Sequence, residues 1–124
     1  MNTVLNNTVR AFNRRDYREA VRQSQEGLAC AQGRDEAFWM GLLEACEGYE
    51  HLVGKQMLQA EAKLIGSMQK LRNFGFRYQN FEVTVALAGI RRAVEEIRAV
   101  RHENKKIFDV SLLPQLRLAA RADD

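Results

Sequence analysis

Apolar residues recur every three or four positions along most of the chain, which is the spacing of one face of an α-helix. This pattern predicts five helices, at about 3–13, 17–32, 36–53, 55–74 and 80–105. The only proline, Pro114, lies beyond all five and interrupts none of them. No segment alternates like a half-buried strand, and the nearest candidate, "FEVTVALAG", continues at helical spacing. The chain is therefore expected to be all-α.

Capping residues mark several of the predicted helix ends. Asp16 precedes the second helix and Glu19 lies three residues on, which predicts a capping box. In that arrangement Asp16 accepts from the backbone N–H of Glu19, and the Glu19 side chain reaches back. Gly33 is placed to end the same helix in the left-handed conformation. Asp35 is predicted to cap the third helix, and Gly54 to end it.

Length and composition fit a single hydrophobic core. The chain has 124 residues, of which 46% are hydrophobic and 28% are charged, as in an ordinary globular domain. We expect one domain over residues 1–124, an antiparallel bundle of four to five helices with its core at about residues 3–106. Residues 107–124 are expected to form a C-terminal tail that lies extended across the bundle.

The last predicted helix carries a heptad pattern. Its apolar positions step by four, three, four and three residues, and they are Val83, Leu87, Ile90, Val94 and Ile97. Such a seam places a helix nearly parallel to its packing partner, which is either a neighbouring helix or a second chain. We favour the second chain and predict a homo-oligomer, a dimer, that forms through these five residues.

Charge and hydropathy bear on the protein's partners and its location in the cell. The 19 Lys and Arg residues outnumber the 16 Asp and Glu residues only slightly, which does not by itself argue for a nucleic-acid partner. No apolar run approaches the roughly 20 residues that span a membrane, and the first residues lack the apolar stretch of a secretory signal. We expect a cytoplasmic protein without membrane contact. Cys30 and Cys46 lie among small and apolar residues, and we expect buried free thiols rather than a disulfide or a metal pair.

Glu44, Glu47 and His51 share one side of the third predicted helix. Carboxylates and a histidine at such spacings build metal sites in helical bundles, but there the ligands point inward and facing helices supply more of them. Here the three residues lie away from the centre of the apolar face, and no other segment offers a matching pair. We favour a solvated face with a Glu47–His51 pair and predict no bound metal. The small residues Gly41 and Gly48 beside them predict the close approach of another helix.

A basic stripe follows the last predicted helix and consists of Arg91, Arg98, Arg101 and Lys105. Such a stripe can contact phosphates. However, Glu95 lies within it and no aromatic residues interleave for base stacking. We favour a solvated helix face, with nucleic-acid binding and the anchoring of an acidic partner as alternatives.

The remaining motifs are structural. We find no glycine-rich phosphate loop and no Ser/His/Asp or Cys/His constellation, and we expect neither a catalytic residue nor a cofactor. The adjacent Phe38 and Trp39 are expected in the core rather than as a ligand platform.

Two stretches, "FNRRDYREAVRQSQEGL" and "FWMGLLEACEGYEH", resemble small bacterial and archaeal helical proteins grouped as domain of unknown function family 309. The matching positions are Phe12, Asn13, Tyr17, Glu19, Ala20, Phe38, Gly41, Leu42 and His51, with Leu43 and Glu44 as near matches. A terminal Leu-Pro segment resembles Leu113-Pro114. The resemblance covers about half of the chain and implies a small helical bundle.

This chain departs from the family where the family is most polar. The family's His and two Glu, which look like a metal or acid–base group, fall here on Val21, Arg22 and Gln25, and its Trp falls on Leu28. The resemblance therefore implies the family's bundle without its polar centre. We favour a non-catalytic interaction or structural module that self-associates. The alternatives are a metal-dependent hydrolase or acid–base enzyme that uses Glu44, Glu47 and His51, and a weak nucleic-acid binder that uses the basic stripe.

Overall fold

The structure, a computed structural model, describes residues 3–102, 111 and 113–119 and is an all-α bundle, as predicted. Its helices are α1 (Thr3–Asn13), α2 (Tyr17–Cys30), α3 (Arg34–Val53), α4 (Met57–Leu71) and α5 (Val83–His102). A 3-10 turn, η1 (Arg72–Phe74), follows α4, and the two-residue strands β1 (Arg77–Tyr78) and β2 (Phe81–Glu82) precede α5. Lys105 and most of the predicted tail region lie outside the described residues.

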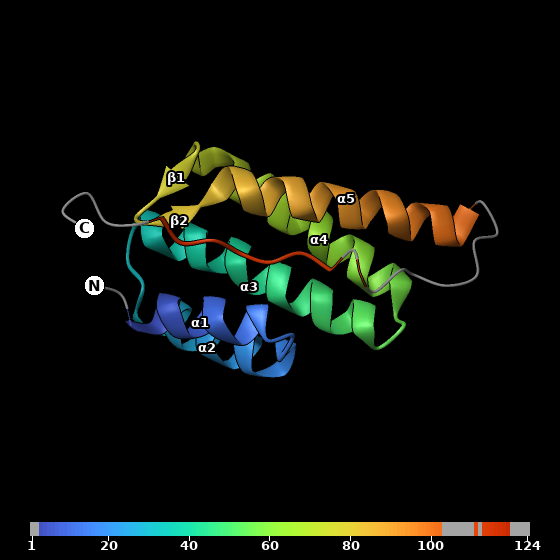
Figure 1. The fold of residues 1–124 in the computed structure, drawn as a ribbon. Helices are drawn as coiled ribbons and strands as arrows, with labels where there is room; N and C mark the ends of the chain where they lie inside the picture. The colour runs from blue at the N-terminus through green and yellow to red at the C-terminus, as the bar shows by residue number, and fades with distance from the viewer. Residues whose placement is uncertain (1–2, 103–110, 112, 120–124) are drawn as a thin grey trace.

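Each helix packs mainly against its neighbours in sequence, so the five helices form a stack of antiparallel helical hairpins. Figure 1 shows α1 and α2 along one side, α3 and α4 in the middle and α5 on the opposite side. Short connections impose this order, because a helix joined to the next by a few residues can only turn back along it.

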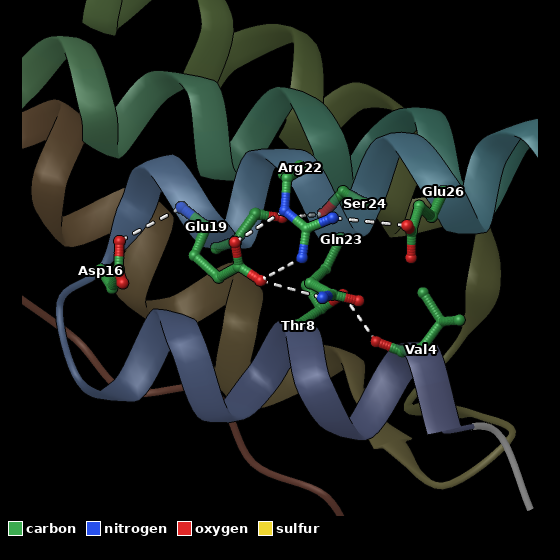
Figure 2. Close-up of polar contacts among 9 residues, drawn as sticks. Val4, Thr8, Asp16, Glu19, Arg22, Gln23, Ser24 and Glu26 are labelled. Carbon is green, nitrogen blue, oxygen red and sulfur yellow. Dashed lines mark hydrogen bonds and ion pairs between the residues drawn. The ribbon is translucent and has the colours of Figure 1, made fainter.

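The turn between α1 and α2 is fixed by Asp16, whose side chain accepts from the backbone N–H of Glu19 at 3.2 Å (Figure 2). This half of the capping box is confirmed. The reciprocal half is wrong, because the Glu19 carboxylate instead accepts from Arg22 at 2.8 Å and from Gln23 at 2.9 Å. An arginine one turn further along the helix provides a charged donor, which binds a carboxylate more strongly than a backbone N–H does.

The ends of α2 and α3 differ in detail from the prediction. Helix α2 ends at Cys30, and Gly33, which has a positive φ of 62°, is the N-cap of α3 rather than the end of α2. Asp35 lies inside the first turn of α3, where its carboxylate accepts a hydrogen bond from the Tyr78 hydroxyl. Gly54 ends α3 as predicted.

Helices α3 and α4 approach each other closely along the small residues that the sequence marks for this role. A Cβ atom at Gly48 would lie 2.6 Å from the Leu64 side chain, and one at Gly41 would lie 3.0 Å from Leu71. The hydroxyl of Ser67 is buried in this contact and donates to the Gly41 carbonyl at 2.7 Å. The predicted close helix approach is confirmed.

Aromatic side chains form two parts of one core. Phe38 is fully buried and contacts Trp39, Phe74, Tyr78 and Phe81, with ring centroids 4.8–5.8 Å apart. The prediction that Phe38 and Trp39 are core residues is confirmed. Around the α1–α2 turn, Phe12 packs edge-on against Tyr17 and Tyr49 at 5.1 Å each.

Of the two cysteines, only Cys46 is buried. Cys30 is exposed, contrary to the prediction. It is the last residue of α2, where the chain leaves the bundle before the α2–α3 connection. A pattern of small neighbours indicated burial, but position at a helix end decided the exposure.

The hairpin and the tail complete the fold at one end. Tyr78 pairs with Phe81 across the turn, and Gln79 adopts a positive φ of 53°. Residues 113–119 run extended alongside α5, back toward the hairpin (the red segment in Figure 1), with Leu113 and Leu116 buried. The predicted extended tail is confirmed for these residues. The sequence pattern predicted a break at 75–80 but not the strands.

Candidate functional site

Glu44, Glu47 and His51 lie beside α4 and each has a partner. Glu44 forms an ion pair with Lys70, and Glu47 forms one with Lys63 at 3.2 Å. Nδ1 of His51 lies 2.7 Å from Oε1 of Gln56, so His51 is bound to the α3–α4 turn rather than to Glu47 as predicted.

The face that carries these residues is only half-exposed, because α4 covers part of it. The predicted solvated face with a Glu47–His51 pair is therefore corrected to a half-exposed seam of ion pairs between α3 and α4. Among the described residues, no group of three or more His, Cys, Asp or Glu side chains is placed to hold a metal ion.

The heptad seam of α5 lies inside the bundle. Val83, Ile90, Val94 and Ile97 are at most 3% exposed in the single chain, and Leu87 is partly buried against the same core. These side chains cannot also form a surface for a second copy. The predicted interface is thus corrected to the contact between α5 and the rest of its own chain, chiefly α4. A heptad pattern shows how a helix packs, but it does not distinguish an internal partner from an external one.

The basic stripe of α5 is partly neutralised. Glu61 of α4 accepts from Nε of Arg98 at 2.8 Å and also pairs with Arg101. The hydrogen bond from Arg98, followed by the contact with Arg101, lowers the pKa of Glu61 despite its partial burial. Arg91 is exposed.

The Glu61 cluster makes a pH-dependent contribution to stability. A carboxyl whose pKa is lower in the folded than in the unfolded chain stabilises the fold above its unfolded pKa of about 4.3 and loses this effect as the pH falls through the folded pKa. We expect Glu61→Gln to reduce the free energy of unfolding by about 1 kcal/mol or less at neutral pH, since both arginines remain partly exposed. Urea denaturation should show this difference shrinking in acid. The control Glu95→Gln, on the exposed face of α5, should show no such trend, and a pH-independent difference at Glu61 would contradict the assignment.

Buried hydroxyl and thiol groups lie between α2 and α3. Burial raises the pKa of Tyr17 to about 12, and it also raises the pKa of Tyr49. Burial likewise raises the pKa of the Cys46 thiol to about 12, against a weaker opposing effect of the Ser24 hydroxyl. A thiol with such a pKa stays protonated at neutral pH and is a poor nucleophile.

The Tyr49 hydroxyl is buried without a hydrogen-bond partner in the described part of the chain. A buried polar group without a partner costs about 1–3 kcal/mol of desolvation. We therefore expect Tyr49→Phe to leave the free energy of unfolding unchanged or to raise it by up to about 1 kcal/mol. The same change at Tyr78, whose hydroxyl donates to Asp35, should lower it. Urea denaturation of the two variants measures both changes. A decrease in the free energy of unfolding for Tyr49→Phe as large as that for Tyr78→Phe would contradict the prediction.

The site with the most specific geometry holds residues 113–119, and we call it the tail site. It consists of Asn13 at the end of α1, the segment Asn80–Glu82 and Gly89 on α5. The Asn13 side chain accepts from the backbone N–H of Leu116 at 2.8 Å and donates to the Leu116 carbonyl at 3.0 Å. One amide side chain thus pairs with both polar groups of one extended residue, as a neighbouring strand would.

The opposite edge of the same segment pairs with β2. The backbone N–H of Glu82 donates to the Arg117 carbonyl at 2.9 Å, and the backbone N–H of Ala119 donates to the Asn80 carbonyl at 2.6 Å. Phe81 and Leu118 form an antiparallel bridge. The segment is therefore held as a strand with a partner on each edge, a side chain of α1 on one and the backbone of β2 on the other.

Side chains of the segment follow the same geometry. Leu113 and Leu116 are buried and Leu118 packs against the core, whereas Gln115 and Arg117 are exposed. A Cβ atom at Gly89 would lie 2.8 Å from Pro114, so only glycine admits the proline ring there. A pocket of about 320 Å³ opens beside this contact, lined by Ala88, Gly89, Arg92, Ser111, Leu113 and Pro114.

The tail site was not predicted as a site. The sequence indicated the extended tail, and Asn13 was noted only as a position that matches family 309. A polar residue at the end of a helix commonly caps it, so nothing in the local pattern indicated a partner 103 residues away.

Comparison with known proteins does not assign the chain. Neither the protein-family models nor the curated proteins that were searched include a match to it. Within the described residues, no helix combines the length and apolar character needed to cross a membrane.

Proposed function

We propose that this chain is a non-catalytic protein-interaction module and that the tail site is where it binds an extended protein segment. The observation that carries the proposal is the way residues 113–119 are held. Hydrogen bonds to the main chain occupy both edges of the segment, and apolar side chains fill the face toward the core. Recognition of a strand by an exposed sheet edge uses the same division, with affinity from the backbone and specificity from side-chain pockets.

The ion pairs of α3 and α4 support this proposal over an enzyme that uses Glu44, Glu47 and His51. Each of the two carboxylates is already bound to a lysine, and His51 is bound to Gln56. A general base needs a free lone pair directed at its substrate. These residues would have to give up contacts that join two helices before they could act.

The cluster around Glu61 supports the proposal over nucleic-acid binding. Arg98 and Arg101 donate to a carboxylate of the same chain, which offsets part of the positive charge that phosphates would need. Arg91 is the predicted basic residue that remains exposed without a described ion pair. One such charge contributes little to a phosphate-binding surface.

We propose that self-association uses the tail site in place of the heptad seam of α5. A second copy carries the same residues 113–119, so its tail would fit the tail site as the chain's own tail does. Native mass spectrometry across protein concentrations tests this. A dimer that disappears in the Leu116→Asp variant supports exchange of tails, whereas an unchanged dimer assigns self-association to another surface.

We also propose that the chain is a divergent, cytoplasmic member of domain of unknown function family 309. The matching residues support this because they hold the fold together. Phe12, Tyr17 and Phe38 are core aromatics, Gly41 lies at the α3–α4 contact, and Asn13 binds the segment that contains Pro114. A crystal structure of a family member that lacks the Asn13–tail contact would weaken the assignment.

The experiment that tests the interaction site uses the full-length chain with Leu116→Asp, which places a charge where the buried leucine holds the tail. A fluorescent peptide with the sequence of residues 111–119, SLLPQLRLA, is added in trans. We expect saturable binding by fluorescence anisotropy, and at least about tenfold weaker binding when Asn13→Ala is added, since two hydrogen bonds are lost.

The control is Gln115→Asp, which places the same charge on the exposed side of the tail. This variant should keep its tail in place and resemble the unmodified chain in peptide binding. If the Leu116→Asp chain keeps its helical circular dichroism but does not bind the peptide, the tail site is not a recognition site.

A further inference from the structure

We infer that the tail site binds an extended partner segment with the pattern Leu-Pro-polar-Leu-polar-Leu. We also infer that the chain's own tail occupies the tail site and competes with the partner segment for it. This inference rests on the proposed interaction function and adds the ligand's chemistry, its direction and its regulation. Three features of the site carry it.

The first feature is that backbone contacts fix the direction of the segment. Asn13 binds the N–H and the carbonyl of Leu116. On the other edge, the N–H of Glu82 donates to the carbonyl of Arg117, and the carbonyl of Asn80 accepts from the N–H of Ala119. The bridge between Phe81 and Leu118 is antiparallel. A segment entering with the opposite direction would present its donors and acceptors in the wrong order to both edges.

The second feature is that the contacts of the side chains fix the pattern. Leu113 and Leu116 are buried and Leu118 is partly buried. The exposed polar residues Gln115 and Arg117 lie on either side of Leu116. Pro114 lies over Gly89, the position at which a side chain is excluded. Proline has no N–H, and none of the hydrogen bonds described for residues 113–119 requires an N–H at this place. The partner segment therefore carries its proline one residue after the first leucine.

The third feature is that the contacts that hold the tail are not specific to a tethered segment. They consist of main-chain hydrogen bonds, one amide side chain and leucine burial, all of which an untethered segment can supply. The tail has the advantage of attachment to the same chain, which gives it a high effective concentration at the site. The apparent association constant for a partner then equals the intrinsic association constant multiplied by the fraction of chains whose site is open.

The test measures binding of four labelled peptides to three full-length chains by fluorescence anisotropy. The chains are the unmodified protein, Leu116→Asp and Gly89→Ala. The peptides are SLLPQLRLA, the same peptide with Pro114→Gly, the reversed sequence and a scrambled sequence of equal composition. We expect SLLPQLRLA to bind Leu116→Asp at least about tenfold more tightly than it binds the unmodified chain. The reversed and scrambled peptides should bind Leu116→Asp at least about tenfold more weakly than SLLPQLRLA does.

The Gly89→Ala chain provides a second way to open the site that leaves Leu116 in place. Its new methyl group meets the proline of its own tail, and alanine is a better helix former than glycine, so the helix should be preserved. We expect this chain to prefer the Pro114→Gly peptide over SLLPQLRLA, and we expect Leu116→Asp to show no such preference. The result therefore does not depend on one variant folding.

Each negative result identifies which statement fails. Equal affinity of the unmodified and Leu116→Asp chains for SLLPQLRLA would overturn competition by the tail but leave the interaction site intact. Equal binding of the scrambled peptide would overturn the pattern, and equal binding of the reversed peptide would overturn the direction. No binding of any peptide to either variant, with helical circular dichroism retained, would overturn this inference together with the proposed function.

Discussion

Replacing Phe38 by alanine is expected to lower the free energy of unfolding by about 3–5 kcal/mol. The ring is fully buried and contacts four aromatic neighbours that come from α3, η1, β1 and β2. Its removal leaves a cavity at the point where the hairpin joins the bundle, and rings held by aromatic contacts do not collapse easily into such a space. A loss of this size is a large part of the total stability of about 5–15 kcal/mol that is usual for a domain.

Urea denaturation followed by far-UV circular dichroism measures the effect. The matched control is Phe76→Ala, because Phe76 lies two residues after Phe74 and is 84% exposed. The control should change stability by less than about 0.5 kcal/mol. Similar losses for the two variants would show that Phe38 does not hold the hairpin against the bundle.

Gly27→Ala is expected to destabilise the protein by about 1–3 kcal/mol, although alanine is favoured over glycine inside a helix by about 1 kcal/mol. A Cβ atom at Gly27 would lie 2.5 Å from the Trp39 indole, which is itself buried. The indole is rigid and has no free space to move into, so α2 and α3 would have to separate. The steric cost is therefore expected to exceed the gain in helix propensity.

Gly66→Ala is the matched control, since Gly66 also lies inside a helix and also has a close neighbour. That neighbour is the carboxylate of Glu44, the end of a flexible side chain that can rotate away. We expect a change within about 1 kcal/mol of zero, because the gain in helix propensity offsets the weakened ion pair with Lys70. Thermal or urea denaturation compares the two, and stabilisation by Gly27→Ala would contradict the packing of Trp39 on Gly27.

The partners of the polar side chains distinguish the enzyme, nucleic-acid and interaction hypotheses. Glu44, Glu47 and Glu61 each join α4 to a neighbouring helix through a basic residue. These ion pairs engage the carboxylates that an enzyme would use and the arginines that a nucleic-acid binder would use. The amide of Asn13 is different, because it binds the backbone of a segment that is distant in sequence and supplies nothing to its own helix.

The positions of the helices were determined by the sequence itself. Apolar spacing of three and four residues, the Asp16 cap, the glycine at 54 and the small residues Gly41 and Gly48 act over one or two helical turns, so they can be read without knowledge of the fold. The extended tail could also be predicted from the sequence, because Pro114 and an irregular apolar pattern exclude a helix. The two short strands carry too few residues to show an alternating pattern. A two-stranded hairpin is marginally stable alone, and here β2 also has the tail as a second neighbour, which the local sequence does not indicate.

Only the tertiary structure decided which surfaces meet. The Val83–Ile97 seam has the same pattern whether it faces α4 or a second chain, and burial assigned it to the chain itself. The partners of Glu44, Glu47 and His51 come from α4 and the turn before it, and the partner of Asn13 lies near the other end of the sequence. Periodicity specifies which face of a helix is apolar, but contacts between distant segments depend on how all the helices pack together, and that packing also placed the tail site.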